Sequence, residues 1–330
     1  MNLNITSVLS EMIAKEPKVI KCSELLNFIS LNIKSVSNFI TSIQKYDLGK
    51  YLAIKLSSRK PSVKDVDIAL YSFHHDDIVY FMERSPKPLR NLLKKYLNIY
   101  DVCNIVVKLK SLYGYCKAEL LPIGNLQRLK LTDKLVNACN LDELIELTAL
   151  AVGEEYANML SELRRFEKID IDMLSNVEGS LINTSLTNFF EEFRGKPTFN
   201  AINCLKMFNN LLKLVPMMRK YASYSELKVE GFSGFFERVS ELGLGICWRE
   251  TIEFSTQIKT LKKELIPLML VVLINRCCLP NLLSDPESYD TVLKYLIKRL
   301  TELYLVRYII TSLISGVDFH EEIPRLKCYE

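Results

Sequence analysis

Residues 100–110 read YDVCNIVVKLK, and two further stretches repeat their pattern, FNAINCLKMFN at 199–209 and TELYLVRYIIT at 301–311. Each stretch has a polar or acidic residue in second place. Apolar residues then recur every three or four positions, which is the spacing of one face of an α-helix. The copies begin 99 and 102 residues apart in a chain of 330 residues. A period this long predicts three related helical subdomains rather than a short solenoid repeat.

The composition favours helices over strands. Hydrophobic residues make up 48% of the chain and charged residues 25%, with only 11 Gly and 11 Pro, which is enough apolar material for a packed core. Apolar positions with helical spacing recur over residues 22–44, 92–113, 142–193 and 288–315. No segment longer than a few residues alternates with a period of two, the pattern of a half-buried strand. The sequence therefore predicts an all-α fold.

Capping residues and breakers mark the expected helix boundaries. Ser62 and Asp65 have the spacing of a capping box, so a helix should start there. Pro86 and Pro88 should break the chain and begin the next helix, which should end at Gly114.

Later boundaries are marked in the same way. The helical stretch over 142–193 should be interrupted near Gly153 and Gly179, and the sequence 195–197 (Gly-Lys-Pro) is the cleanest break in the middle of the chain. The last long helix should end at Gly316, and residues 318–326 should form a short terminal helix.

Charge and hydropathy exclude two classes of protein. The net charge is +4, and no basic run of five or more residues occurs, so we expect no nucleic-acid partner. The longest apolar run, residues 265–274, is about half the length that a membrane-spanning helix needs. We therefore expect this run to be a core helix and the protein not to span a membrane.

The nine cysteines favour a reducing compartment. Cys103, Cys139 and Cys204 lie within helical apolar patterns, where a thiol behaves as a small hydrophobic group. No secretory signal opens the chain. We expect free, mostly buried thiols and a cytoplasmic location.

The motifs of nucleotide and metal chemistry are missing or incomplete. Gly243 and Gly245 are followed by Trp248 at the third glycine position of a dinucleotide fingerprint, and no P-loop sequence occurs. Residues 74–77 (His-His-Asp-Asp) have metal-capable side chains, but four adjacent residues on a helix cannot converge on one ion, so a solvated helix start is the favoured interpretation. We expect no catalytic, cofactor-binding or metal-binding residues.

A basic face and a pair of asparagines are the remaining candidates. Arg84, Lys87, Arg90 and Lys94 recur at helical spacing and form either a contact surface for an acidic partner or lipid headgroups, or a solvated face. Lys95 extends this set. In the first two copies of the repeat, an asparagine holds the fifth place. The favoured interpretation of these amides is a buried structural role.

The repeat stretches resemble the C subunit of archaeal A-type ATP synthases, a family that includes the d subunit of V-type ATPases. The first copy carries the family signature at residues 100–105, followed by Leu-Pro-Ile-Gly at 121–124. The chain departs from the family pattern at Lys110, usually Arg, at Asn209 and at Leu305, where Asn is common. The residues that carry the resemblance are Tyr100, Asp101, Asn104, Asn203, Glu302 and Arg307.

The resemblance implies a fold and a function. The fold would be three pseudo-threefold-related helical bundles that form a funnel-like single chain, with approximate boundaries at residues 1–125, 126–232 and 233–330. The function would be that of a non-catalytic central-stalk subunit on the cytoplasmic face of the membrane. Its partners would be the proteolipid rotor ring and the central-shaft D and F subunits.

Two other functions remain open from the residues alone. The chain could be a soluble all-helical adaptor or scaffold, which would bind soluble partners and would not associate with membranes. An all-α enzyme is disfavoured, because no acid–base pair, metal set or nucleophile arrangement stands out.

Overall fold

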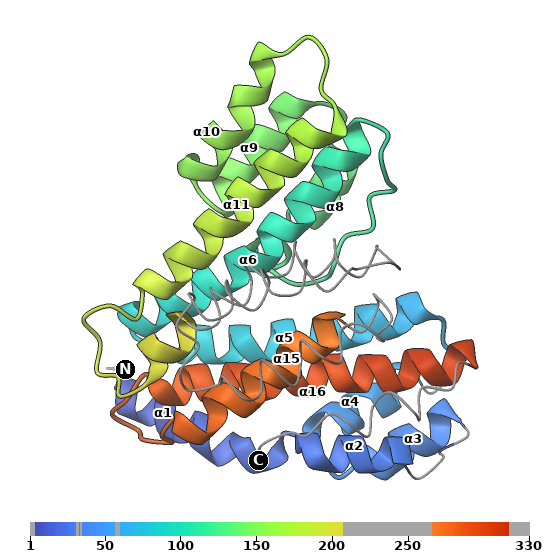
Figure 1. Cartoon of the computed structure of the whole chain (residues 1–330), viewed down its shortest axis with the longest axis vertical. Coiled ribbons are helices and arrows are strands. Elements are labelled where there is room, and N and C mark those ends of the chain that lie inside the picture. The colour runs from blue at the N-terminus through green and yellow to red at the C-terminus, as the bar shows by residue number, and fades with distance from the viewer. Residues whose placement is uncertain (1–3, 31–32, 34, 57–59, 207–265, 317–330) are drawn as a thin grey trace, which may run out of the picture. The chain divides into compact units, whose positions relative to one another are not determined.

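The computed structural model describes residues 4–30, 33, 35–56, 60–206 and 266–316. Every regular element in these ranges is a helix, which confirms the predicted all-α class (Figure 1). The chain forms two compact units. The first consists of residues 67–194 together with the first five residues, and the second consists of residues 6–66 and 195–330.

The first unit is built around α6, its longest helix. Contacts between helices place α6 against α11 and α9, while α10 packs against α9. The elements that contribute to this unit are α5 (Val63–Arg84), α6 (Lys87–Leu112), α7 (Asn125–Arg128), α8 (Thr132–Asn137), α9 (Leu141–Ala151), α10 (Glu154–Ser161), the 3-10 turn η2 (Glu162–Arg165) and α11 (Ile171–Glu191).

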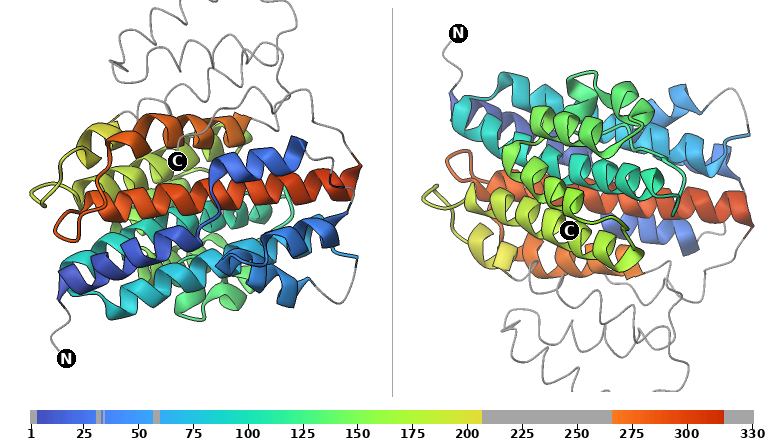
Figure 2. Two further views of the ribbon diagram at one scale, coloured as in Figure 1. Left: turned by 90° about the horizontal axis from the view of Figure 1, so that it is seen from below. Right: turned by 90° about the horizontal axis from the view of Figure 1, so that it is seen from above.

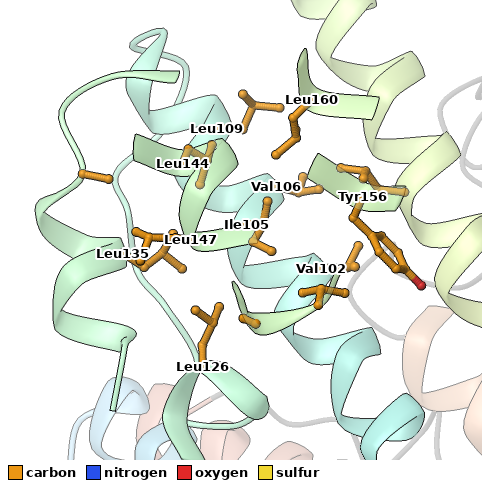
Figure 3. Packing of buried hydrophobic residues seen from close by; sticks show 14 of the residues in the cluster. Val102, Ile105, Val106, Leu109, Leu126, Leu135, Leu144, Leu147, Tyr156 and Leu160 are labelled. Atoms are coloured by element: carbon orange, nitrogen blue, oxygen red, sulfur yellow. The ribbon is translucent and has the colours of Figure 1, made fainter. Parts of the chain in front are cut away.

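One apolar cluster forms the core of this unit (Figure 3). From α6 it takes Val102, Ile105, Val106 and Leu109, which lie on one face because 3.6 residues make a turn. Their partners come from α7, α8, α9, α10 and α11 and include Leu126, Leu135, Leu144, Leu147, Tyr156, Leu160, Leu174 and Leu181. The apolar spacing in the first repeat stretch is therefore the spacing of a core face.

The second unit joins residues from both halves of the chain. Its helix α16 packs against α15 and also against α2 and α3, so helices from the two ends of the sequence lie side by side (Figure 2). The elements are α1 (Ile5–Lys15), η1 (Glu16–Lys18), α2 (Cys22–Ser30), α3 (Val36–Ile43), α4 (Asp47–Lys55), α15 (Ile266–Cys278), η4 (Leu279–Asn281) and α16 (Asp290–Ser315).

Most predicted boundaries are confirmed. The Ser62 and Asp65 side chains accept hydrogen bonds from each other's main-chain N–H groups, so the capping box forms and α5 begins at Val63. Pro86 and Pro88 open α6, and Gly114 follows its end with a φ of 78°.

The later breakers also lie where they were expected. Gly153 separates α9 from α10, Gly316 ends α16 in the left-handed conformation, and the break at 195–197 coincides with the boundary between the two units.

Two helix predictions are wrong. The helix expected over 22–44 is two helices, because Ser35 adopts an extended conformation and its hydroxyl caps a new start by accepting from the Asn38 N–H. Gly179 lies within α11, and the interruption falls instead before Asp170, whose side chain caps that helix by accepting from the Met173 N–H. Continuous apolar spacing does not reveal a cap inside it.

The run at 265–274 is a core helix, as predicted. Its residues 266–274 lie in α15, where Leu268, Val272, Leu273 and Ile274 are buried. Among the helices that the structure describes, none combines the length and the apolar character needed to cross a bilayer.

The cysteines differ from the expectation of free, buried thiols. Cys204 and Cys278 form a disulfide with each other. Cys22 and Cys277 each take part in a disulfide as well. Helical spacing shows which face of a helix a cysteine occupies but not which faces meet. The described residues include three free thiols, of which the last two are exposed: Cys103, Cys116 and Cys139.

The division into three repeats stays a prediction. The boundary at 232, the glycines at 243 and 245, most of the second repeat stretch after residue 206 and the terminal helix expected at 318–326 lie outside the described residues.

Asp290 holds the start of the second repeat stretch within the second unit. This first residue of α16 is completely buried, and its carboxylate accepts hydrogen bonds of 3.0–3.1 Å from the N–H groups of Phe199, Asn200 and Ala201. Residues 201–206 are helical, so Asp290 caps a helix start that is distant in sequence. N–H groups at a helix start have no partner within the helix, and a carboxylate there also interacts favourably with the helix dipole.

Replacing Asp290 with Ala should destabilise the second unit by about 3 kcal/mol, because one buried and two part-buried N–H groups would lose their acceptor. Urea unfolding of the full chain measures this, and hydrogen exchange at residues 199–201 localises it. The matched control is Asp285→Ala, which removes one exposed bond to the Glu287 N–H and should change stability by less than about 1 kcal/mol. Equal stability of the two variants would contradict the capping role.

Candidate functional site

The signature of the first repeat lies on a buried polar face of α6. Asn98, Asp101, Asn104 and Lys108 are all buried, and their spacing of three, three and four residues places them in one row along the helix. We call these four residues the polar stripe. Buried polar groups are destabilising unless they are hydrogen-bonded, so the partners of the stripe show what it does.

Asp101 caps the short helix α7. Its two carboxylate oxygens accept from the main-chain N–H groups of Asn125 at 2.6 Å and Leu126 at 2.9 Å. The chain approaches so closely at Gly124 that a Cβ atom there would lie 2.0 Å from the Asp101 Oδ1 atom. Gly124 also has a φ of 121°, which L residues rarely adopt. The glycine is therefore required both by the conformation and by the contact.

Burial raises the pKa of Asp101 from 3.8 to about 7. The N–H groups of Leu126 and Asn125 and the charge of Arg128 oppose this rise, because they favour the ionised carboxylate. The carboxyl group thus titrates near neutral pH although it is hydrogen-bonded.

Asn104 of the stripe binds the segment that connects α6 to α7. The Asn104 amide donates to the carbonyl groups of Leu121 and Ile123 and accepts from the Leu121 N–H at 2.8 Å. Asn104 thus has the buried structural role that was favoured for it.

The two ends of the stripe complete this arrangement. The Asn125 Nδ2 atom donates to the Asn98 Oδ1 atom at 2.7 Å, and the Lys108 Nζ atom donates to the Val136 carbonyl at 2.7 Å. The stripe therefore fastens residues 121–126 and 136 to α6, mostly by side-chain to main-chain bonds. These bonds make the attachment of this segment to α6 rigid.

Sequence reasoning missed Asn98, Lys108 and Asn125. The signal that could have found the first two is the continuation of polar residues at helical spacing on both sides of Asp101 and Asn104. Asn125 carries no such signal, because only the folded connection brings it beneath α6.

Tyr100 belongs to an aromatic cluster in the first unit rather than to the stripe. Its hydroxyl lies 3.0 Å from the Tyr96 hydroxyl, which lies 2.8 Å from the His74 Nε2 atom. The rings of Tyr71 and His74 contact the Tyr100 ring edge to face. These contacts pack α5 against α6.

The solvated helix start predicted for residues 74–77 is wrong. These residues lie in the middle of α5, and His74, His75 and Asp77 are buried. Burial also lowers the pKa of His75. The helix starts eleven residues earlier, at Val63, so this segment faces the interior. Within the described residues, no three His, Cys, Asp or Glu side chains form a group that could hold a metal ion.

The second-place residues of all three copies bind distant main chain. The Glu302 Oε1 atom accepts from the Ile20 N–H at 2.9 Å, and the Asn200 Nδ2 atom donates to the Asn281 carbonyl at 2.8 Å. With Asp101, each copy therefore uses this position to hold a segment that is far away in sequence.

The buried charge of Glu302 is paired. Arg299 donates from its Nη1 atom to the Glu302 Oε2 atom at 2.7 Å and from its Nε atom to the Tyr295 hydroxyl. Arg299 and Glu302 are both 1% exposed, so this pair satisfies charges that burial would otherwise strongly disfavour.

The other two signature residues are less buried. Asn203 is exposed, so the expectation of a buried amide is wrong at that position. The buried face of residues 201–206 consists of Ala201, Cys204 and Leu205, and Asn203 points away from it. Arg307 is partly exposed on α16.

Comparison with known proteins places this arrangement in a family. The family model of the ATP synthase (C/AC39) subunit matches residues 14–207, a range that contains the whole polar stripe. The chain belongs to the ATP synthase (C/AC39) subunit family. The chain is also similar to the C subunit of the A-type ATP synthase of Pyrococcus furiosus, with 25% identity over 165 residues. That alignment covers 49% of this chain and 42% of the relative, so the chain matches less than half of the relative's length.

In this C/AC39 family member, the basic residues do not share one helix face as predicted, because Arg84 is the last residue of α5 and the others lie in α6. The Arg90 guanidinium donates to the carbonyl groups of Met82 and Ser85 and so satisfies the end of α5. The Arg84 guanidinium lies 3.7 Å from the centroid of the Tyr80 ring and donates to the Tyr80 carbonyl. Lys87 and Lys94 are exposed on α6, and Lys95 is partly exposed.

Replacing Gly124 with Ala should destabilise the first unit by about 3 kcal/mol or more, because the new Cβ atom would overlap the Asp101 carboxylate at an unfavourable φ. The matched control is Gly179→Ala on α11, where an added Cβ atom meets nothing within 4 Å. That variant should gain about 0.5–1 kcal/mol from helix propensity. Urea unfolding measures both changes, and two variants of equal stability would disprove the close contact.

The stability advantage of the natural chain over the Asp101→Asn variant should shrink as the pH rises from about 4 to about 7. The folded pKa of Asp101 lies above its unfolded value, so the folded state binds the extra proton in this window and loses relative stability as the proton leaves. The full pKa difference corresponds to at most about 4 kcal/mol. Unfolding measured at several pH values tests this.

The control for this pH series is Asp133→Asn, at an exposed residue of α8. Its stability difference from the natural chain should stay nearly constant over the same range. A difference for Asp101→Asn that stays constant or grows with pH would show that Asp101 is ionised throughout.

Proposed function

We propose that the chain is a non-catalytic central-stalk subunit of a rotary A/V-type ATP synthase. In this role it would couple the membrane proteolipid rotor ring to the central shaft during ion transport and ATP synthesis or hydrolysis. The observation that carries the proposal is the family match over residues 14–207. The name of the Pyrococcus relative, the C subunit of an A-type ATP synthase, supports the same complex type.

The internal bonding of the chain suits a part that transmits torque. A coupling subunit must resist deformation, because compliance would absorb the rotation that it has to pass on. In the first unit the polar stripe fixes a long connection to α6, and in the second unit Asp290 and Glu302 fix segments that are distant in sequence. Satisfied buried polar networks of this kind rigidify a fold.

The proposed arrangement is three helical bundles, divided near residues 125 and 232, that form a funnel. In this proposal, one end of the funnel sits on the proteolipid ring at the cytoplasmic face of the membrane. The D and F subunits of the shaft enter its cavity. The chain would then be peripheral to the membrane and would take no part in the ATP chemistry itself.

The test is purification of the tagged full chain from native membranes in mild detergent, followed by identification of the proteins that accompany it. We expect proteolipid, shaft and nucleotide-binding ATPase subunits, because a coupling part binds both sectors. Recovery of soluble proteins only, with nothing from the membrane sector, would overturn the proposal and favour a helical adaptor.

A charge-reversal variant tests the basic face in the same experiment. Lys87→Glu with Lys94→Glu should reduce the recovery of the partner that this face contacts, because both side chains are exposed on α6. The control pair is Lys50→Glu with Lys60→Glu, at exposed positions of the second unit. Equal recovery with both pairs would show that the basic face is only a solvated surface.

A further inference from the structure

A disulfide and a set of hydrogen bonds fasten the same junction of the second unit. Cys204 lies in the helical stretch 201–206, and Cys278 is the last residue of α15. The Cα atoms of the bonded pair are 5.4 Å apart, and 74 residues separate them in sequence. The bond therefore closes a long loop of the chain.

The hydrogen bonds at this junction are made by atoms that take no part in the disulfide. Asp290 holds the N–H groups of residues 199–201, and the Tyr289 N–H donates to the Pro197 carbonyl at 2.9 Å. The Asn200 Nδ2 atom donates to the Asn281 carbonyl, and the Asn281 Nδ2 atom donates to the Cys277 carbonyl. With the disulfide open, these bonds would still keep residues 197–200 beside the corner at 277–290. The two sulfur atoms would then stay close enough to pair again.

We propose that the Cys204–Cys278 disulfide is a reversible redox clamp, opened by a protein dithiol of the thioredoxin class. When closed, it fixes residues 201–206 to the end of α15. When open, it leaves the start of that stretch held by its hydrogen bonds. The proposal concerns this junction and does not depend on the proposed role in the ATP synthase.

The exposure of the two cysteines decides which sulfur atom the reductant attacks. Cys204 is 8% exposed and Cys278 is 1% exposed, so the reductant thiolate attacks the Cys204 Sγ atom and releases the Cys278 thiolate, which takes up a proton. The second thiol of the reductant then attacks the mixed disulfide and releases Cys204 as a thiol. The reductant leaves as its own disulfide, so it supplies two electrons and two protons.

The clamp should change the local dynamics more than the fold. The Cys204 N–H donates to the Asn200 carbonyl, and after reduction this turn is held at its N-terminal side only. We expect hydrogen exchange of residues 201–206 to accelerate on the order of tenfold or more. The thermal midpoint of the second unit should fall by about 10 °C, since the closed loop is long.

The test uses the full chain isolated with its thiols blocked at lysis. Peptide mapping by mass spectrometry should find the Cys204 and Cys278 peptides linked. Thioredoxin with its reductase and NADPH should separate them, accelerate exchange at 201–206 and lower the thermal midpoint. Removing the reductant under mild oxidation should restore all three observations.

Two variants separate this bond from the exposed free thiols. Cys204→Ser with Cys278→Ser should show the fast exchange without reductant and should not respond further at residues 201–206. Cys116→Ser with Cys139→Ser, at exposed free thiols, should behave like the natural chain. Unlinked peptides, a bond that thioredoxin leaves intact in the folded protein, or opening without any change in exchange would each overturn the proposal.

Discussion

Buried carboxylates that hold main-chain N–H groups are the interaction on which this structure depends. Asp101 caps α7, Asp290 caps the helix start at residue 201, and Glu302 holds the Ile20 N–H. In each case the acid lies on α6 or α16, the two longest helices that the structure describes, and the N–H group belongs to a segment far away in sequence. Because unpartnered N–H groups in an apolar interior are strongly unfavourable, these carboxylates decide where the connecting segments lie.

The apolar core and these polar bonds contribute to the fold in different ways. Burial of Val102, Ile105, Val106 and Leu109 drives α6 into contact with its neighbours, but apolar contacts are not directional and would tolerate small shifts. The hydrogen bonds from Asn104 to residues 121 and 123 can form in only one register of this segment against α6. This member of the ATP synthase (C/AC39) subunit family thus combines a helical core with fixed connections.

The sequence predicted those features that depend on local chemistry. The capping box at Ser62 and Asp65, the stop at Gly114 and the helical class follow from hydrogen bonding and spacing within a few residues. The same reasoning failed for His74, whose burial depends on which helices cover α5, and for Cys204, whose partner is 74 residues away. For the signature residues, sequence could identify Asp101 and Asn104 but not their partners, because the partners are main-chain atoms whose positions only the complete fold sets.

The second unit is formed from two separate stretches of the chain, so its parts are synthesised at different times on the ribosome. Helices α2 and α3 precede their packing partner α16 by about 250 residues, whereas residues 67–194 of the first unit form one continuous stretch of the chain. At a synthesis rate of about 5–20 residues per second, the apolar faces of the first helices wait roughly 10–50 s for their partner. The nascent chain is therefore exposed to aggregation through its earliest segments, and chaperones that bind short amphipathic helices would have their effect in that interval.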